Sequence, residues 1–122
     1  MTNAIQDLGR HGEEQAAVYL QNQGLRVVEK HVQTRWGEID LICEDKGDWV
    51  FVEVKTRTRA TQPSALDAIT PAKRKRLINA ALMYMKKHRL EGENMRFDVV
   101  SIEADHIEWI PGAYEGSSRY TF

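Results

Sequence analysis

Two apolar runs in the middle of the chain, residues 36–42 and 49–55, have the hydrophobic pattern of β-strands. Both are rich in Ile, Val, Phe and Trp, and the polar residues 45–48 separate them, so the pattern predicts a β-hairpin. In the second run alternation places Glu53 and Lys55 on one face, about 7 Å apart along the strand. The length of this run predicts a central strand that is covered on both faces.

The rest of the chain predicts two long helices and three further strands. An apolar stripe predicts a helix over residues 4–23, and Thr70-Pro71 predicts the start of a second helix whose stripe reaches Met85. Strands are expected at residues 25–30, 96–102 and 106–110, with residues 31–35 as a connection and Pro111-Gly112 as the end of the last strand. The order αβββαββ predicts one α/β (α+β) domain over residues 1–122, with a central mixed β-sheet flanked by helices.

The hairpin turn fixes which residues are opposed. If Lys46-Gly47 is a two-residue turn, Asp45 pairs with Asp48, and the same register sets Asp40 opposite Glu53 with Cβ atoms about 5 Å apart. Two facing carboxylates in an apolar strand pair repel each other, so we expect a cation between them. Lys55 is one candidate and a divalent metal is the other.

A surface salt bridge on the wet face of a sheet is the competing interpretation of Glu53 and Lys55. For these two residues alone it would be preferred, but the opposed Asp40 and the buried character of the strand favour a metal site. Glu13 lies on the inward face of the first helix, with Ala16, Ala17 and Leu20. Three interpretations of Glu13 are open: it lies at the edge of the apolar stripe, it pairs with a basic residue, or it adds a third carboxylate to the site.

Composition is that of an ordinary soluble protein, with 42% hydrophobic and 29% charged residues. No apolar run approaches 18 residues and residues 1–7 lack the features of a signal peptide, so we expect no membrane association. The single cysteine, Cys43, excludes an internal disulfide and fits a cytoplasmic protein.

The charge is strongly divided along the chain, although the net charge is only −1. Residues 55–89 contain ten basic side chains and one acid, and the remainder is correspondingly acidic. Four of the bases, residues 73–76, fall in the first turns of the second helix, where cations oppose the helix dipole, so an anionic partner is the better explanation. A DNA-binding surface is therefore predicted at Arg57, Lys73, Arg74 and Arg76.

Several segments together resemble a bacterial family of small endonuclease-like proteins, the YraN-like family, within the restriction-endonuclease-like nucleases. The matching segments are Gly12-Glu13, Gly37-Glu38-Ile39-Asp40-Leu41-Ile42, Phe51-Val52-Glu53-Val54-Lys55-Thr56-Arg57, Thr70-Pro71-Ala72-Lys73, Arg96-Phe97-Asp98-Val99-Val100 and Ile107-Glu108-Trp109-Ile110. The core is also similar to that of archaeal Holliday-junction resolvases. Departures are Ile39, where the broad nuclease pattern has proline, His31, where the family often has Asn, and a poorly matching loop at residues 58–66.

The resemblance implies a restriction-endonuclease-like core and hydrolysis of phosphodiester bonds. Glu13, Asp40 and Glu53 would be ligands of Mg²⁺ or Mn²⁺, and Lys55 the catalytic lysine. Zinc is not expected, because the histidines and Cys43 have no ligand spacing. Two functions are carried forward: a metal-dependent endonuclease acting on DNA, including branched or damaged DNA, and a nucleic-acid-binding or adaptor protein with little activity. A structural domain is the weakest alternative, and the sequence leaves a homodimer open.

Overall fold

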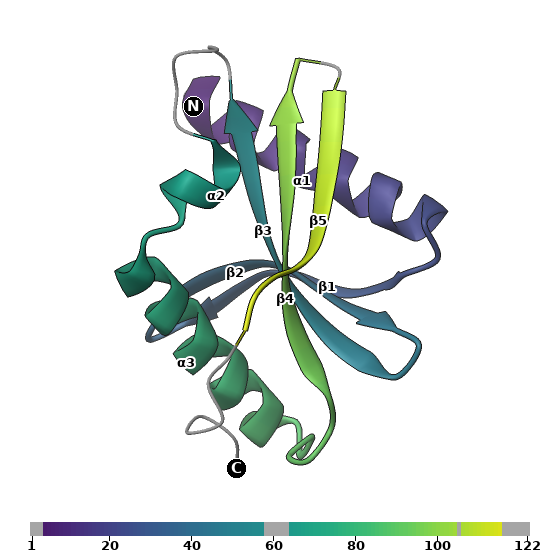
Figure 1. Ribbon diagram of the computed structural model, residues 1–122, viewed down its shortest axis with the longest axis vertical. Helices are drawn as coiled ribbons and strands as arrows, with labels where there is room; N and C mark the ends of the chain where they lie inside the picture. The colour runs from purple at the N-terminus through teal and green to yellow at the C-terminus, as the bar shows by residue number, and fades with distance from the viewer. Residues whose placement is uncertain (1–3, 58–63, 105, 116–122) are drawn as a thin grey trace.

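The computed structural model describes residues 4–57, 64–104 and 106–115. Within these ranges five strands form one sheet in the spatial order β1-β2-β3-β4-β5 (Figure 1). β3 and β4 are parallel and the other neighbours are antiparallel, so the expected mixed sheet is confirmed. The elements in chain order are α1 (Ala4–Asn22), β1 (Arg26–Thr34), β2 (Gly37–Asp45), β3 (Asp48–Arg57), α2 (Ala65–Ala68), α3 (Pro71–Lys87), β4 (Met95–Glu103) and β5 (His106–Tyr114).

The predicted αβββαββ order is confirmed, with the short helix α2 as an addition. A mixed five-stranded sheet with flanking helices is consistent with a restriction-endonuclease-like fold. The hairpin turn is also as predicted: Asp45 pairs with Asp48, and both Lys46 and Gly47 have positive φ, at 51° and 92°. Positive φ at both central residues is typical of the two-residue turns that match the twist of the paired strands.

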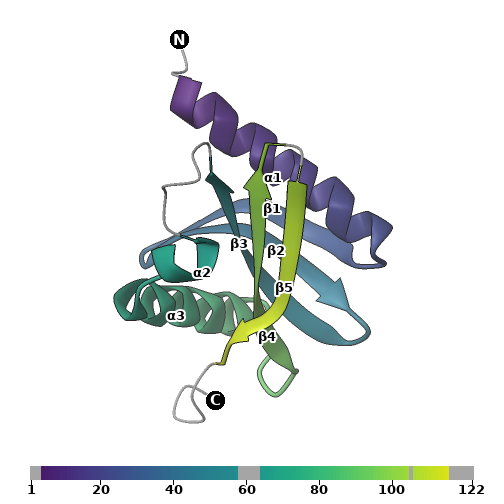
Figure 2. The same ribbon diagram turned by 45° about the horizontal axis from the view of Figure 1, so that its top comes forward.

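The central strand β3 is buried on both faces, as its apolar run predicts. Helix α1 covers one face, where Leu20 belongs to the same buried cluster as Val52. Helix α3 covers the other face, where Met85 and Phe51 share a second cluster. Figures 1 and 2 show the two helices on opposite sides of the sheet. Side chains at alternate positions of β3 therefore face different helices, and Glu53 and Lys55 share the face of Phe51, which α3 covers.

Three boundaries differ from the sequence-based expectation. Residues 31–34 belong to β1 rather than to a connection, because β1 continues pairing with β2 as far as the partners Thr34 and Gly37. β5 continues through Pro111-Gly112 to Tyr114, which an edge strand permits because proline needs no ladder partner there. Helix α2 is a four-residue turn that carries no periodic signal. Of the loop expected at residues 58–66, residues 58–63 lie outside the described residues, and residues 65 and 66 belong to α2.

The turn of the β2–β3 hairpin is held by a buried ion network. Asp98 of β4 is 1% exposed and accepts hydrogen bonds from Arg96, from Nε1 of Trp109 at 2.9 Å and from the backbone N–H of Gly112 at 2.9 Å. Arg96 also pairs with Asp45 at 2.9 Å. These contacts satisfy a carboxylate that would otherwise be costly to bury, and they tie the hairpin turn to β4.

Among the described residues, neither α1 nor any other helix has the length and apolar character required to cross a lipid bilayer.

Candidate metal and phosphate site

Asp40 lies where β2 and β3 separate. Their ladder runs from the pair Asp45–Asp48 to the pair Leu41–Val52 and ends there, so the expected direct pairing of Asp40 with Glu53 is not part of it. Instead the Oδ2 atom of Asp40 accepts a hydrogen bond of 2.8 Å from the backbone N–H of Val54. A side chain thus takes the place of the next backbone pairing, and it brings the carboxylate of Asp40 to β3 beside Glu53.

Glu53 and Lys55 lie on the same face of β3, as alternation predicts. Nζ of Lys55 is 3.3 Å from Oε1 of Glu53, and the two side chains are 27% and 15% exposed. Both groups are thus largely withdrawn from water while the ammonium group neutralises one carboxylate. Lys55 is therefore one cation of this site, as the sequence analysis allowed, but two further carboxylates share it.

The pKa values of the two β-strand carboxyls are raised. Burial is the main cause for Asp40, whose pKa rises to about 6, and the charges of Glu13 and Glu38 raise it further. Burial likewise raises the pKa of Glu53 to about 7, helped by the charge of Asp40 and opposed by Lys55. The N–H of Val54 and the ammonium of Lys55 therefore do not offset the loss of hydration. A cation bound at these carboxylates would lower both pKa values.

Glu13 comes to the site from α1, and a glycine makes this possible. A Cβ atom at Gly12 would lie 2.4 Å from Oγ1 of Thr56, so the absence of a side chain allows α1 to pack closely on β3. The next residue, Glu13, is then directed at the sheet with a side chain that is 13% exposed. Burial raises its pKa, the charge of His31 opposes the shift, and a hydrogen bond with Asp40 also lowers it. The predicted inward position of Glu13 is confirmed.

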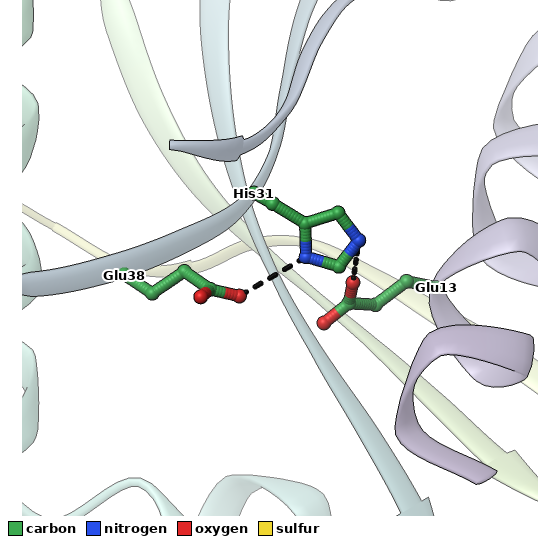
Figure 3. A group of neighbouring side chains, drawn as sticks. All are labelled: Glu13, His31 and Glu38. Carbon is green, nitrogen blue, oxygen red and sulfur yellow. Dashed lines mark hydrogen bonds and ion pairs between the residues drawn. The ribbon is translucent and has the colours of Figure 1, made fainter. Parts of the chain in front are cut away.

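The structure adds two residues that the sequence analysis did not place in the site, His31 and Glu38. Nε2 of His31 is 2.7 Å from Oε2 of Glu13, and Nδ1 is 3.1 Å from Oε1 of Glu38. Figure 3 shows the imidazole between the two carboxylates. The register between β1 and β2 explains this position. The flanking pairs Lys30–Leu41 and Val32–Ile39 set His31 level with Asp40. The premature end assigned to the first strand concealed it.

Metal-ligating atoms are most closely grouped around His31. In the part of the chain that the structure describes, one trio of His, Cys, Asp or Glu residues has all its ligand atoms within 4.8 Å of one another, namely Glu13, His31 and Glu38. Asp40 joins this trio through its hydrogen bond with Glu13, and Glu53 joins through Asp40. The site is thus a chain of four carboxylates and one imidazole, in which oxygen donors suited to Mg²⁺ or Mn²⁺ predominate.

The predicted DNA-binding residues divide into two groups. Lys73 lies close to Lys55, whose charge lowers the pKa of Lys73, and Arg76 is exposed one turn further along α3. Arg57 instead pairs with Glu103 at 2.5 Å. Arg74 donates from Nε to the carbonyl of Ile69 at 3.2 Å and stacks on the ring of Tyr114. Lys73 and Arg76 therefore extend the positive charge that begins at Lys55. Arg57 and Arg74 also make contacts within the protein that stabilise the fold.

Comparison with known proteins gives one consistent result. The pattern of the uncharacterised protein family UPF0102 matches residues 12–102, a span that contains every residue of the site described above. A UPF0102 protein of Shewanella woodyi is 42% identical over 106 residues, which cover 87% of this chain and 90% of that protein. A UPF0102 protein of Herminiimonas arsenicoxydans is 39% identical, over 92% of this chain and 90% of that protein. A UPF0102 protein of Photorhabdus laumondii is 40% identical, over 88% of this chain and 86% of that protein.

Proposed function

The chain belongs to the uncharacterised protein family UPF0102, and we propose that it is a metal-dependent endonuclease that hydrolyses phosphodiester bonds in DNA. The observation that carries the proposal is the meeting of Asp40, Glu53 and Lys55 where β2 and β3 separate. This arrangement offers a cation two carboxylates and offers a phosphate an ammonium group in the same partly dehydrated space. Phosphodiester hydrolysis needs both, because negative charge accumulates on phosphate oxygens in the transition state.

Each residue has a chemical role in the proposal. Asp40, Glu53 and Glu13 hold Mg²⁺ or Mn²⁺, which when bound polarises the scissile phosphate and lowers the pKa of a water molecule. The hydrogen bond from Val54 fixes the carboxylate of Asp40, so that little reorganisation is needed when the substrate arrives. Lys55, held at 3.3 Å from Glu53, orients the attacking water or stabilises the developing negative charge.

The basic residues at one end of the site form the proposed DNA-binding surface. Lys73 lies beside Lys55 in the first turn of α3, Arg76 follows one turn later, and both would contact DNA phosphates. Arg57 and Arg74 remain in the proposed surface, although each also has a partner within the protein. Charge contacts of this kind read the backbone rather than the bases, so we infer that the shape of the DNA, such as a branch or a damaged position, decides where it is cut.

A cleavage screen tests the proposal. The chain is incubated with linear, flapped and four-way DNA in Mg²⁺ or Mn²⁺, with EDTA and the variant Asp40→Asn as controls. Metal-dependent products from the wild type that are missing with Asp40→Asn would support the endonuclease. DNA binding without cleavage of any substrate would favour the second candidate, a nucleic-acid-binding or adaptor protein.

A further inference from the structure

His31 has a conformation and a setting that a simple surface histidine does not need. Its φ of 54° lies in the left-handed region, which histidine occupies more readily than most residues but still at a cost. The side chain is 40% exposed, and it lies between Glu13 of α1 and Glu38 of β2 (Figure 3). The positive φ of His31 is an unfavourable backbone conformation within β1, and in this conformation the imidazole ring contacts two carboxylates.

Both ring nitrogens of His31 face a carboxylate oxygen. Oε1 of Glu38 is 3.1 Å from Nδ1 of His31, and Oε2 of Glu38 accepts a hydrogen bond of 2.5 Å from Nε2 of Gln33. A neutral imidazole has one N–H, so it can donate to Glu38 through Nδ1 or to Glu13 through Nε2, but not to both. In the tautomer with the hydrogen on Nδ1, the ring donates to Glu38. In the neutral imidazole the lone pair is then on Nε2, which is the nitrogen that faces Glu13.

The contact between Nε2 of His31 and Glu13 therefore needs a positive charge. The two atoms are 2.7 Å apart, and a lone pair facing a carboxylate oxygen at that distance is repulsive. Oε2 of Glu13 is also buried and has no hydrogen-bond donor among the described residues. A second proton, on the ring or on Glu13, or a metal ion between the two atoms would remove the conflict. Two ligands of one ion with bonds near 2.1 Å are about 3 Å apart in octahedral geometry, close to this separation.

We propose that Glu13 and His31 hold a second divalent cation, of the Mn²⁺ type, and that Glu38 orients the imidazole for it. A carboxylate that accepts the other N–H of a ligating histidine is the usual partner of such a site. An imidazole nitrogen favours Mn²⁺ and later transition metals over Mg²⁺, so this position discriminates between the two cations. The proposal shares Glu13 with the proposed nuclease centre, because Glu13 also bonds Asp40, but it does not depend on cleavage.

The functional consequence is a two-cation centre with unequal sites. The Asp40–Glu53 position has oxygen donors from the carboxylates and accepts Mg²⁺ or Mn²⁺, whereas the His31 position selects for Mn²⁺. Because His31 is 40% exposed, ligand positions on that ion remain open to water or to a phosphate oxygen. A second cation held there would add positive charge to the centre that also contains Lys55.

Manganese binding to the tag-free chain tests the inference. We expect two Mn²⁺ per chain by equilibrium titration, and pulsed electron paramagnetic resonance should show a ¹⁴N coupling from a directly bound imidazole. His31→Asn should bind one Mn²⁺ and lose the ¹⁴N coupling, and asparagine also tolerates the positive φ at this position. Glu38→Gln should weaken the second site by about 10–100-fold. His106→Asn, an exposed histidine on β5, serves as the matched control and should change neither quantity.

The possible outcomes separate this inference from the proposed function. A wild type that binds a single Mn²⁺ without ¹⁴N coupling would show that a proton bridges His31 and Glu13, and would overturn the second site. An unchanged coupling in His31→Asn would also overturn it, because the nitrogen would belong to another residue. Two bound Mn²⁺ with the nitrogen signal, but no cleavage of any DNA, would retain the second site and reject the endonuclease.

Discussion

Oδ2 of Asp40 accepts a hydrogen bond from the backbone N–H of Val54, a residue of the neighbouring strand 14 positions further along the chain. The bond occurs one step beyond the last paired residues of β2 and β3, Leu41 and Val52. It closes the gap between the separating strands with a charged side chain and sets that charge beside Glu53.

Divalent metal should stabilise the protein through Asp40 and Glu53. At a concentration 100 times the dissociation constant, Mn²⁺ would add about 2.7 kcal/mol to the free energy of unfolding. For a chain of this size that corresponds to a rise in Tm of roughly 10 °C. Asp40→Asn should lose most of this rise while its amide oxygen still accepts from Val54. Glu108→Gln, an exposed residue of β5, is the control, and an equal rise in Asp40→Asn would contradict the assignment.

Without metal, stability should fall as the pH rises. The folded protein holds its protons more tightly than the unfolded chain, because the pKa values of Asp40 and Glu53 rise to about 6 and about 7. The stability contributed by these protons is complete below about pH 4, the ordinary carboxyl range, and is lost by about pH 7. Urea unfolding in EDTA at several pH values measures it. The double variant Asp40→Asn, Glu53→Gln should have a flatter profile, and parallel profiles would refute the prediction.

Lys55→Ala should remove cleavage while leaving the affinity for DNA nearly intact. Lys55 contacts Glu53, and in the proposed mechanism it acts on the water or on the developing charge rather than on bound DNA. A group needed mainly in the transition state changes the rate more than the binding. Single-turnover cleavage of a labelled four-way junction at saturating protein measures the rate. Equal rates for wild type and variant would show that Lys55 is not catalytic.

DNA binding should weaken steeply with salt, and Lys73 and Arg76 should account for part of the slope. Each phosphate contact contributes about 0.9 to the slope of log affinity against log salt. Replacing both residues by alanine should therefore reduce the slope by about 1.8. Lys86 and Lys87, exposed at the opposite end of α3, are the matched controls. Binding that does not respond to salt, or an equal effect of the control pair, would exclude this surface.

Gly12→Ala should destabilise the protein although alanine is the better helix former. The new Cβ would lie 2.4 Å from Oγ1 of Thr56, and relieving such an overlap typically costs about 1–3 kcal/mol. The added variant Thr56→Ala removes Oγ1 and should restore most of the loss, which denaturant unfolding of the two single variants and the double variant would measure. If Gly12→Ala alone is as stable as the wild type, α1 does not pack on β3 as closely as described.

Local patterns were enough to predict the order of the main elements along the chain, the turn of the β2–β3 hairpin and the inward face of Glu13. These features depend on alternation, on turn residues and on helical periodicity, all of which can be read within about ten residues. His31 was missed because the charged segment Glu29-Lys30-His31 reads as the end of a strand, although its partners in β2 continue the ladder. Its positive φ has no sequence signal.

Long-range contacts explain the remaining differences. Arg57 and Arg74 looked free for DNA, but their partners Glu103 and Tyr114 are 46 and 40 residues away in the chain. Asp40 was expected to oppose Glu53 through a regular ladder, but the β2–β3 ladder ends at the pair Leu41–Val52. Pairing rules for flat strands cannot anticipate where a twisted sheet opens.

The parallel pairing of β3 with β4 has a consequence for how the chain is made. β3 ends at residue 57 and β4 begins at residue 95, so during synthesis β3 has emerged well before the neighbour that will cover its free edge. Over that interval the apolar segment around Phe51 is an unprotected sheet edge of the kind on which nascent chains aggregate. Glu53, Lys55 and Arg57 place charges along the rest of the same edge, and charged side chains discourage another strand from pairing there. The residues proposed for chemistry in the finished protein would thus also keep it soluble before it is finished.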